Sequence, residues 1–153
     1  MQLSQVFLEL GEDSFVQLLR AISMGKLRTF QLYERLKTRC HLAKLNTENL
    51  RKAAPRLLER LRSGDEDLAT DLSQSILISN FQMIVDVLNL LGIPHEDGFF
   101  VKDLDPAPYL TEGWKDRIYN EFKGRYTDAL LLFYINHLAV ELSKEDNVYV
   151  PAA

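Results

Sequence analysis

The sequence predicts an all-α protein: a single-domain bundle of about six or seven helices around two strongly apolar central helices, 65–91 and 125–143. Apolar residues recur at helical spacing along most of the chain. Glycines follow these periodic segments, where left-handed helix caps lie. No long stretch alternates apolar and polar residues, so no extended sheet is expected. With 153 residues, 46% of them hydrophobic, the chain has the size and composition of one globular domain, 1–153.

The glycine punctuation divides the chain into seven expected helices. Asp13 is placed to cap the second and Thr111 the sixth. Pro55 lies inside the fourth, where it either kinks the helix or starts a new one. The segments are 2–10, 13–24, 26–44, 47–63, 65–91, 112–123 and 125–143.

The 65–91 segment begins and ends with strong signals. Ser63-Gly64-Asp65-Glu66 resembles a capping box, and Leu91-Gly92-Ile93-Pro94 stops a helix. Its polar residues fall at spacings of four and three, which would place them in one narrow stripe on an otherwise apolar helix. That stripe either faces solvent or lines a cleft. Its members are Ser75, Ser79, Gln82, Asp86 and Asn89.

Residues 93–111 form the one long irregular stretch, which holds three of the five prolines. Phe99-Phe100-Val101 is the one place where a short strand is expected. The segment is too aromatic for a disordered loop, so we expect it to pack across the core.

Charge is distributed very unevenly along the chain. Residues 26–62 contain eleven Lys and Arg against three Glu, a net charge of +8. Residues 63–153 contain six Lys and Arg against sixteen Asp and Glu, a net charge of −10. Such asymmetry indicates an anionic partner, or an acidic part of the same protein that covers the basic one.

The basic segment predicts two helices that each bury an apolar face and present a basic one. Three cations share one face of 26–44, and three share one face of 47–63. Together they define the basic face, our candidate partner-binding surface: Arg28, Arg35, Arg39, Lys52, Arg56 and Arg60.

These patterns favour a non-enzymatic helical interaction module, self-associating, whose basic face 26–62 meets an acidic surface. The expected partner is a second copy or another acidic protein. No catalytic residue and no cofactor are predicted, since no nucleophile motif or phosphate-binding glycine loop is present. Cys40 lies at an apolar helical position and is expected to be structural.

Two alternatives stay open. The same basic helices could bind nucleic acid, with 29–41 and a helix capped at Asn46 forming a helix-turn-helix. Against this, the turn lacks glycine and Pro55 interrupts the second helix. The third class is a small-ligand or metal-binding bundle using His95, His137 and Glu141, although no Glu-x-x-His motif occurs.

A single cysteine can form neither an internal disulfide nor a zinc site. The first residues show no signal-peptide pattern, and the apolar windows 76–91 and 129–140 are interrupted or too short to cross a membrane. We therefore expect a cytoplasmic protein without a membrane-spanning segment.

Overall fold

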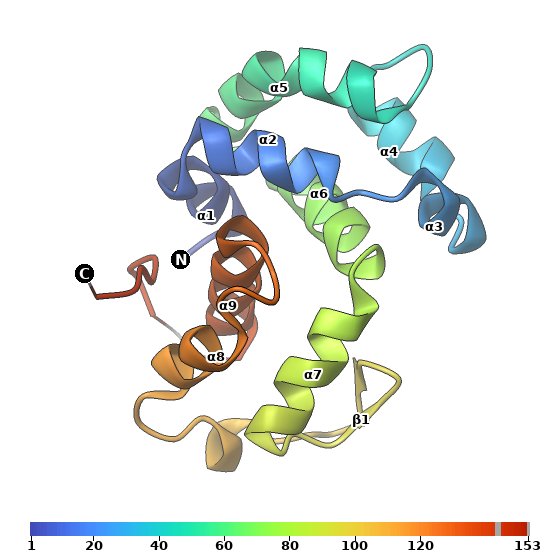
Figure 1. Cartoon of the computed structure of the whole chain (residues 1–153). Coiled ribbons are helices and arrows are strands. Elements are labelled where there is room, and N and C mark those ends of the chain that lie inside the picture. The colour runs from blue at the N-terminus through green and yellow to red at the C-terminus, as the bar shows by residue number, and fades with distance from the viewer. Residues whose placement is uncertain (143–144, 153) are drawn as a thin grey trace. The chain divides into compact units, whose positions relative to one another are not determined.

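The structure, a computed structural model, describes residues 1–142 and 145–152. It is essentially all-α, with only a two-stranded sheet, which confirms the predicted fold class (Figure 1). Along the described chain the elements are α1 (Leu3–Leu10), α2 (Glu12–Arg20), α3 (Met24–Thr29), α4 (Tyr33–Arg39), α5 (Thr47–Arg62), α6 (Glu66–Ile78), α7 (Phe81–Leu91), β1 (His95–Glu96), β2 (Phe99–Phe100), the 3-10 helix η1 (Ala107–Tyr109), α8 (Trp114–Phe122) and α9 (Asp128–Leu142).

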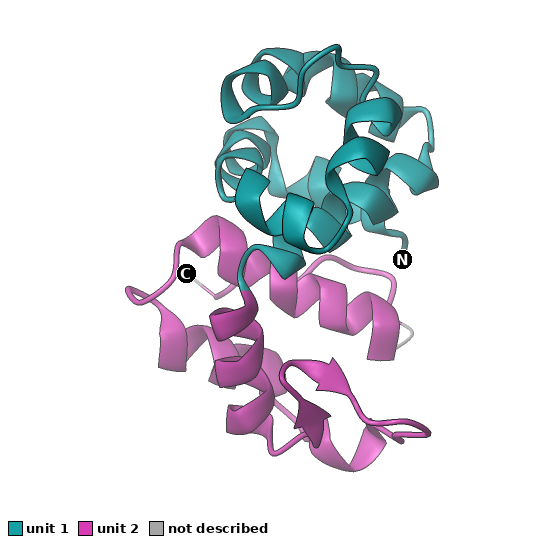
Figure 2. Cartoon of the chain, turned by 90° about the vertical axis from the view of Figure 1, so that its right-hand side faces the viewer, with its two compact units in different colours: residues 1–80 teal, residues 81–153 magenta. Residues whose placement is uncertain are grey.

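The chain divides into two compact units, Met1–Asn80 and Phe81–Ala153 (Figure 2). The sequence predicted one domain over 1–153, and that stays a prediction. Buried apolar residues lie in both units. We describe the two units separately.

Unit 1 is built on α1, α2, α5 and α6, which pack against one another, while α4 packs on α6. Phe7 and Phe15 are fully buried and meet edge to face, with ring centroids 5.6 Å apart. Of the two possibilities for Pro55, the structure has one continuous helix, α5, with the proline inside it. Pro55 is exposed, and so is Arg51, whose carbonyl loses its helical hydrogen bond to the proline.

The predicted helix 26–44 is wrong, because the chain forms two short helices there, α3 and α4. After α3, Gln31 adopts a φ of 60°, and the Leu32 N–H donates to the Leu27 carbonyl at 2.7 Å. This is a Schellman ending in which glutamine takes the left-handed position that glycine usually occupies. His41 ends α4 in the same way, with a φ of 55°. Neither of these helix ends carries a glycine, so the positions of the glycines in the sequence could not reveal them.

The predicted helix 65–91 is also broken, into α6 and α7, at Ser79 and Asn80. Side chains bond backward to helical carbonyls there: Ser79 Oγ donates to the Ser75 carbonyl at 2.7 Å, and Asn80 Nδ2 donates to the Ile76 carbonyl at 2.7 Å. Such bonds compete with continuation of the helix. Ser79 Oγ also accepts the Ser23 N–H at 2.8 Å, which ties the break to the chain entering α3.

Unit 2 contains α7, α8 and α9, and α8 packs against both of the others. From Ala129 to Ala139, every residue of α9 except Leu132 is buried, so this predicted central helix is confirmed as a core element. Residues 93–111 begin with a tight antiparallel hairpin in which Glu96 pairs with Phe99. Asp97 and Gly98 both have positive φ, as a type I′ turn requires. Phe99 and Phe100 form a strand as predicted, and Val101 lies outside it.

No single helix in the described ranges is long and apolar enough to span a membrane; α6 and α7 meet those criteria only when taken together as a broken pair.

Candidate functional site

The six residues of the basic face come from three helices. Arg28 lies on α3, where its guanidinium stacks over the Tyr33 ring, 4.2 Å from the centroid. Arg35 and Arg39 lie on α4, and Lys52, Arg56 and Arg60 lie on α5. The break between α3 and α4 separates Arg28 from the helical register that the sequence predicted. The other five keep the helix faces expected of them.

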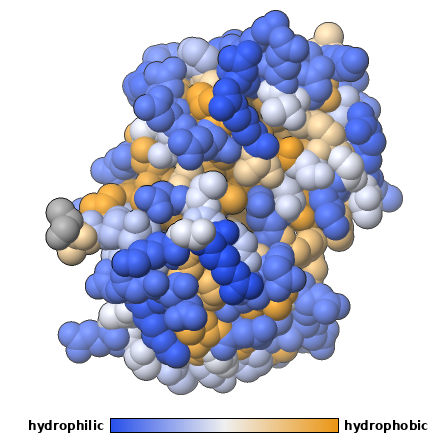
Figure 3. Space-filling view, in the orientation of Figure 1, coloured by the Kyte–Doolittle hydropathy of each residue, from blue (hydrophilic) through white to orange (hydrophobic). Residues whose placement is uncertain are grey.

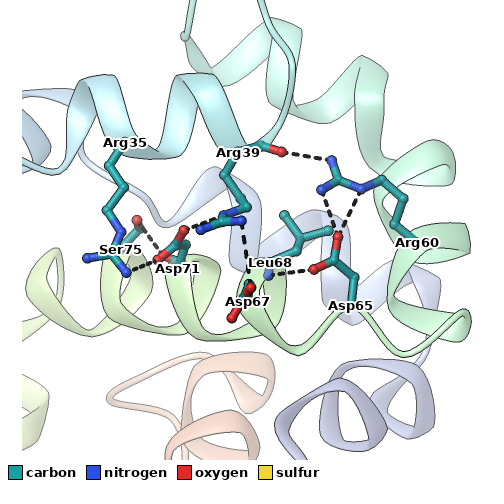
Figure 4. A network of polar contacts seen from close by, with 8 residues as sticks. All are labelled: Arg35, Arg39, Arg60, Asp65, Asp67, Leu68, Asp71 and Ser75. Carbon is teal, nitrogen blue, oxygen red and sulfur yellow. Dashed lines mark hydrogen bonds and ion pairs between the residues drawn. The ribbon is translucent and has the colours of Figure 1, made fainter.

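A buried carboxylate holds the two α4 arginines (Figure 4). Asp71 on α6 is only 3% exposed. Arg39 Nε donates to Asp71 Oδ2 at 2.8 Å, and Arg35 Nη2 lies 2.8 Å from Asp71 Oδ1. Both guanidinium groups remain partly exposed, Arg35 more than Arg39. Asp71 therefore anchors the inner edge of each arginine while the outer edge stays accessible.

Arg60 forms the second half of the network. Its Nη2 and Nε donate to Asp65 Oδ2 at 2.8 and 3.2 Å, and its Nη1 donates to the Arg39 carbonyl at 2.8 Å. Asp65 Oδ1 also accepts the Leu68 N–H at 3.0 Å and thereby caps α6. Arg60 thus joins the end of α4, the end of α5 and the start of α6 (Figure 4).

The charges in this network stabilise one another. The backbone hydrogen bond from Leu68 and the Arg60 guanidinium hold the pKa of Asp65 below its usual value. The hydrogen bond to Asp71 raises the pKa of Arg39. The Asp65 carboxylate is therefore ionised at neutral pH. The acidic start of α6 lies against the basic face, so part of the acidic surface that the sequence analysis anticipated belongs to the same unit.

An open groove of about 500 Å³ lies over this network. Three of the six candidate residues line it, so cationic groups lie in its walls. The lining residues are Glu34, Arg35, Thr38, Arg39, His41 and Arg60.

Lys52 and Arg56 lie on the same face of α5 as Arg60, one and two helical turns before it. Lys52 is 64% exposed and pairs with Glu48 one helical turn earlier, at 3.1 Å. Arg56 is also exposed. Hydrophilic residues cover most of the upper edge of the molecule in Figure 3, where α5 runs in Figure 1. Exposed pairs of this kind contribute little stability, so these side chains are available to a partner.

Cys40, the residue after Arg39, is fully buried. Burial raises the pKa of its thiol to about 11, although Arg60 and Arg56 act in the opposite direction. At neutral pH the sulfur is a thiol and not a thiolate, which agrees with a structural role.

Within residues 1–142 and 145–152, no three His, Cys, Asp or Glu side chains gather as metal ligands. Both ring nitrogens of His95 are engaged, Nε2 with Asn89 Oδ1 at 2.7 Å and Nδ1 with the Gly98 N–H at 3.0 Å. His137 Nε2 lies 3.6 Å from Glu141 Oε1. Burial lowers the pKa of His137 to about 4, so this contact joins a neutral imidazole to a carboxylate. His137 Nδ1 is buried and has no hydrogen-bond partner among the described residues.

The polar stripe is divided by the helix break. Ser75 is buried and donates to the Asp71 carbonyl at 2.8 Å. On α7, Asp86 accepts from Gln82 at 2.8 Å and from the Tyr126 phenol at 2.5 Å. Each of these side chains is engaged in hydrogen bonds on its own side of the helix break, and the five do not form one continuous stripe.

Sequence reasoning missed Asp71, the residue that organises the arginines. It lies four residues after Asp67, in a segment already seen as acidic, and nothing in its neighbours marks it as buried. The hairpin was also recognisable, because Asp97-Gly98 is a strong turn dipeptide between strand-forming residues.

In comparisons with protein-family models, with curated proteins and with solved structures, none matches this chain. Its function is therefore inferred from its own residues.

Proposed function

We propose that this chain is a non-enzymatic interaction module that self-associates when its basic face meets an acidic surface of a second copy. The observation that carries the proposal is the pairing of buried Asp71 with Arg35 and Arg39, which fixes two guanidinium groups at the edge of an open groove.

Fixed arginines favour binding, because a long side chain otherwise loses rotamer freedom when it meets a partner, at about 0.5–1.5 kcal/mol each. Arg35 keeps 55% of its side chain exposed while one nitrogen is anchored on Asp71. A guanidinium has five N–H donors, so an anchored arginine still has donors for an incoming carboxylate. Arg60 is held in the same manner by Asp65.

The acidic counterpart that fits best is segment 96–105 of a second copy. Its four carboxylates are exposed, and Lys102 is its only cation. Phe99 is 55% exposed and Phe100 36% exposed in the same segment, which adds apolar surface to the charge. Acidic residues beside exposed aromatic rings are suited to a contact that combines charge pairing with aromatic burial. The four carboxylates belong to Glu96, Asp97, Asp103 and Asp105.

The network itself argues against a phosphate backbone as the partner. Asp65, Asp67 and Asp71 balance the three arginines that line the groove, and the Asp67 carboxylate is 82% exposed beside Arg39. Duplex binding depends on unpaired cations that replace condensed counterions. One carboxylate of a partner protein can be accommodated here by local hydrogen bonds, whereas the regularly spaced charges of a phosphate backbone extend past the groove onto acidic neighbours.

Charge reversal tests the proposal. Sedimentation velocity at low salt is expected to show a dimer for the natural chain and a monomer for Lys52→Glu with Arg56→Glu. Arg117→Glu with Lys123→Glu is the matched control: these two residues are also exposed cations, and their reversal alters the net charge equally. The control should stay dimeric. Equal loss of dimer in both variants would show that net charge matters and the basic face does not.

A further inference from the structure

The segment that follows α9 folds back across unit 2. At its centre is Asn136, a side chain on α9 with no exposed surface. Asn136 Oδ1 accepts the Tyr149 N–H at 2.6 Å, and Asn136 Nδ2 donates to the Tyr149 carbonyl at 3.1 Å. The same Nδ2 also donates to the Leu132 carbonyl at 2.8 Å. One buried amide therefore binds both backbone groups of a single extended residue, as a neighbouring β-strand would.

Side chains of the segment make two further contacts with the start of α8. The Tyr149 phenol donates to Asp116 Oδ1 at 2.5 Å. Glu145 forms an ion pair with Lys115, whose ammonium also lies over the Trp114 ring, 5.6 Å from its centroid. Lys115 is only 17% exposed, and burial lowers its pKa, while Glu145 places a carboxylate beside its ammonium. The same residues of α8 line an open groove that includes Glu145 and Tyr149.

These contacts have the form of peptide recognition. Backbone hydrogen bonds give affinity without regard to sequence, and the side-chain contacts select an acidic residue four positions before a tyrosine. The segment itself stays largely at the surface, with Glu145 exposed and Val150 64% exposed. It is held mainly by polar contacts that an identical segment from elsewhere can reproduce.

We infer that the surface formed by Asn136, Lys115 and Asp116 is a docking site for an extended peptide, and that segment 145–152 of a second copy is a ligand for it, by exchange with the chain's own segment. The occupant seen in the structure defines the chemistry: a glutamate for Lys115, a tyrosine for Asp116 and an extended backbone for Asn136. This inference names a second route to self-association and does not depend on the basic face.

Exchange competes with the chain's own segment. A segment tethered this closely has an effective concentration on the order of millimolar, so the closed form dominates in dilute solution. Weakening the chain's own segment should therefore open the site to an added one.

A labelled synthetic peptide of residues 145–152 tests the site directly. In fluorescence anisotropy, the full chain with Tyr149→Ala is expected to bind the peptide at least about tenfold more tightly than the natural chain, whose own segment competes. The same peptide with alanine in place of the tyrosine should bind more weakly. Lys115→Glu should abolish binding of the peptide, and a peptide carrying Glu145→Lys should restore binding to this variant. No saturable binding by the Tyr149→Ala chain would overturn the inference.

Exchange between copies is tested by complementation. One chain carries Lys115→Glu and the other Glu145→Lys, so each has like charges within itself and opposite charges across the mixture. Both also carry Lys52→Glu and Arg56→Glu, which removes association through the basic face. Sedimentation should show monomers for each chain alone and a dimer for the mixture. A mixture that stays monomeric at millimolar concentration would refute exchange, and its outcome leaves the proposed function unaffected.

Discussion

Arg39 and Asp71 join α4 to α6 through a hydrogen bond of 2.8 Å between Nε and Oδ2, although Asp71 is almost completely buried. We expect Asp71→Asn to lower the free energy of unfolding by about 1–3 kcal/mol, because one charge-assisted partner of two arginines is lost. Asp67→Asn is the matched control. Its carboxylate is 82% exposed and 3.9 Å from Arg39, so Asp67→Asn should lower the free energy of unfolding by less than about 0.5 kcal/mol.

Urea denaturation followed by far-ultraviolet circular dichroism measures both variants. Equal, small losses would contradict the structural role given to Asp71.

His137 predicts a specific pH dependence of stability. Burial lowers the pKa of its imidazole from 6.5 to about 4 in the folded protein. The unfolded chain therefore binds more protons than the folded chain between these two values, so the free energy of unfolding falls as the pH drops from about 6.5 to about 4. The loss from this residue should be on the order of 1–3 kcal/mol.

Denaturation midpoints at several pH values check this, with His137→Gln as the comparison. The variant should lose most of the dependence in this window. If the midpoints of the variant depend on pH in the same way as those of the natural chain, His137 is not the group responsible.

Phe133 tests the core of unit 2. It is fully buried on α9. Phe133→Ala should lower the free energy of unfolding by about 3–5 kcal/mol, because apolar burial is lost and a cavity remains. Phe99→Ala, at a ring that is 55% exposed and packs edge to face against Phe81, should lower the free energy of unfolding by about 1 kcal/mol or less. Fluorescence of Trp114, the single tryptophan, reports unfolding of unit 2. Equal costs for the two variants would mean that α9 is misplaced.

Nucleic acid should bind poorly. Three arginines of the basic face are paired with aspartates, so we expect no duplex binding at physiological salt tighter than about 10⁻⁴ M. Fluorescence anisotropy with labelled duplex DNA and single-stranded RNA checks this. Micromolar binding that weakens with salt and is abolished by Arg39→Glu with Arg56→Glu would favour the nucleic-acid alternative.

The fold class was predictable because helical periodicity and strong caps act locally. Asn46 caps α5 and Asp65 caps α6 through side-chain hydrogen bonds within three residues, and these starts were found almost to the residue. The errors came where a local signal was absent. Gln31 and His41 end helices in a conformation that usually indicates glycine, so two helices were read as one.

The candidate site was predictable only in part, for a physical reason. Helical spacing predicted exposed positions for Arg35, Arg39 and Arg60; in the structure Arg35 is exposed, whereas Arg39 and Arg60 are partly buried. Their anchor, Asp71, depends on the packing of α4 against α6, a contact between residues 32 positions apart. Asn136 and Tyr149 likewise meet only because the chain folds back after α9. Sequence spacing carries no information about such distant pairs.

Sedimentation velocity of the natural chain across protein concentration and salt tests self-association through the basic face most directly. We expect a dimer at low salt and high protein concentration. It should dissociate as salt is added, since the Debye length, over which charges interact, falls to about 8 Å at physiological ionic strength. A monomer under every condition, including low salt and the highest protein concentration, would contradict the account.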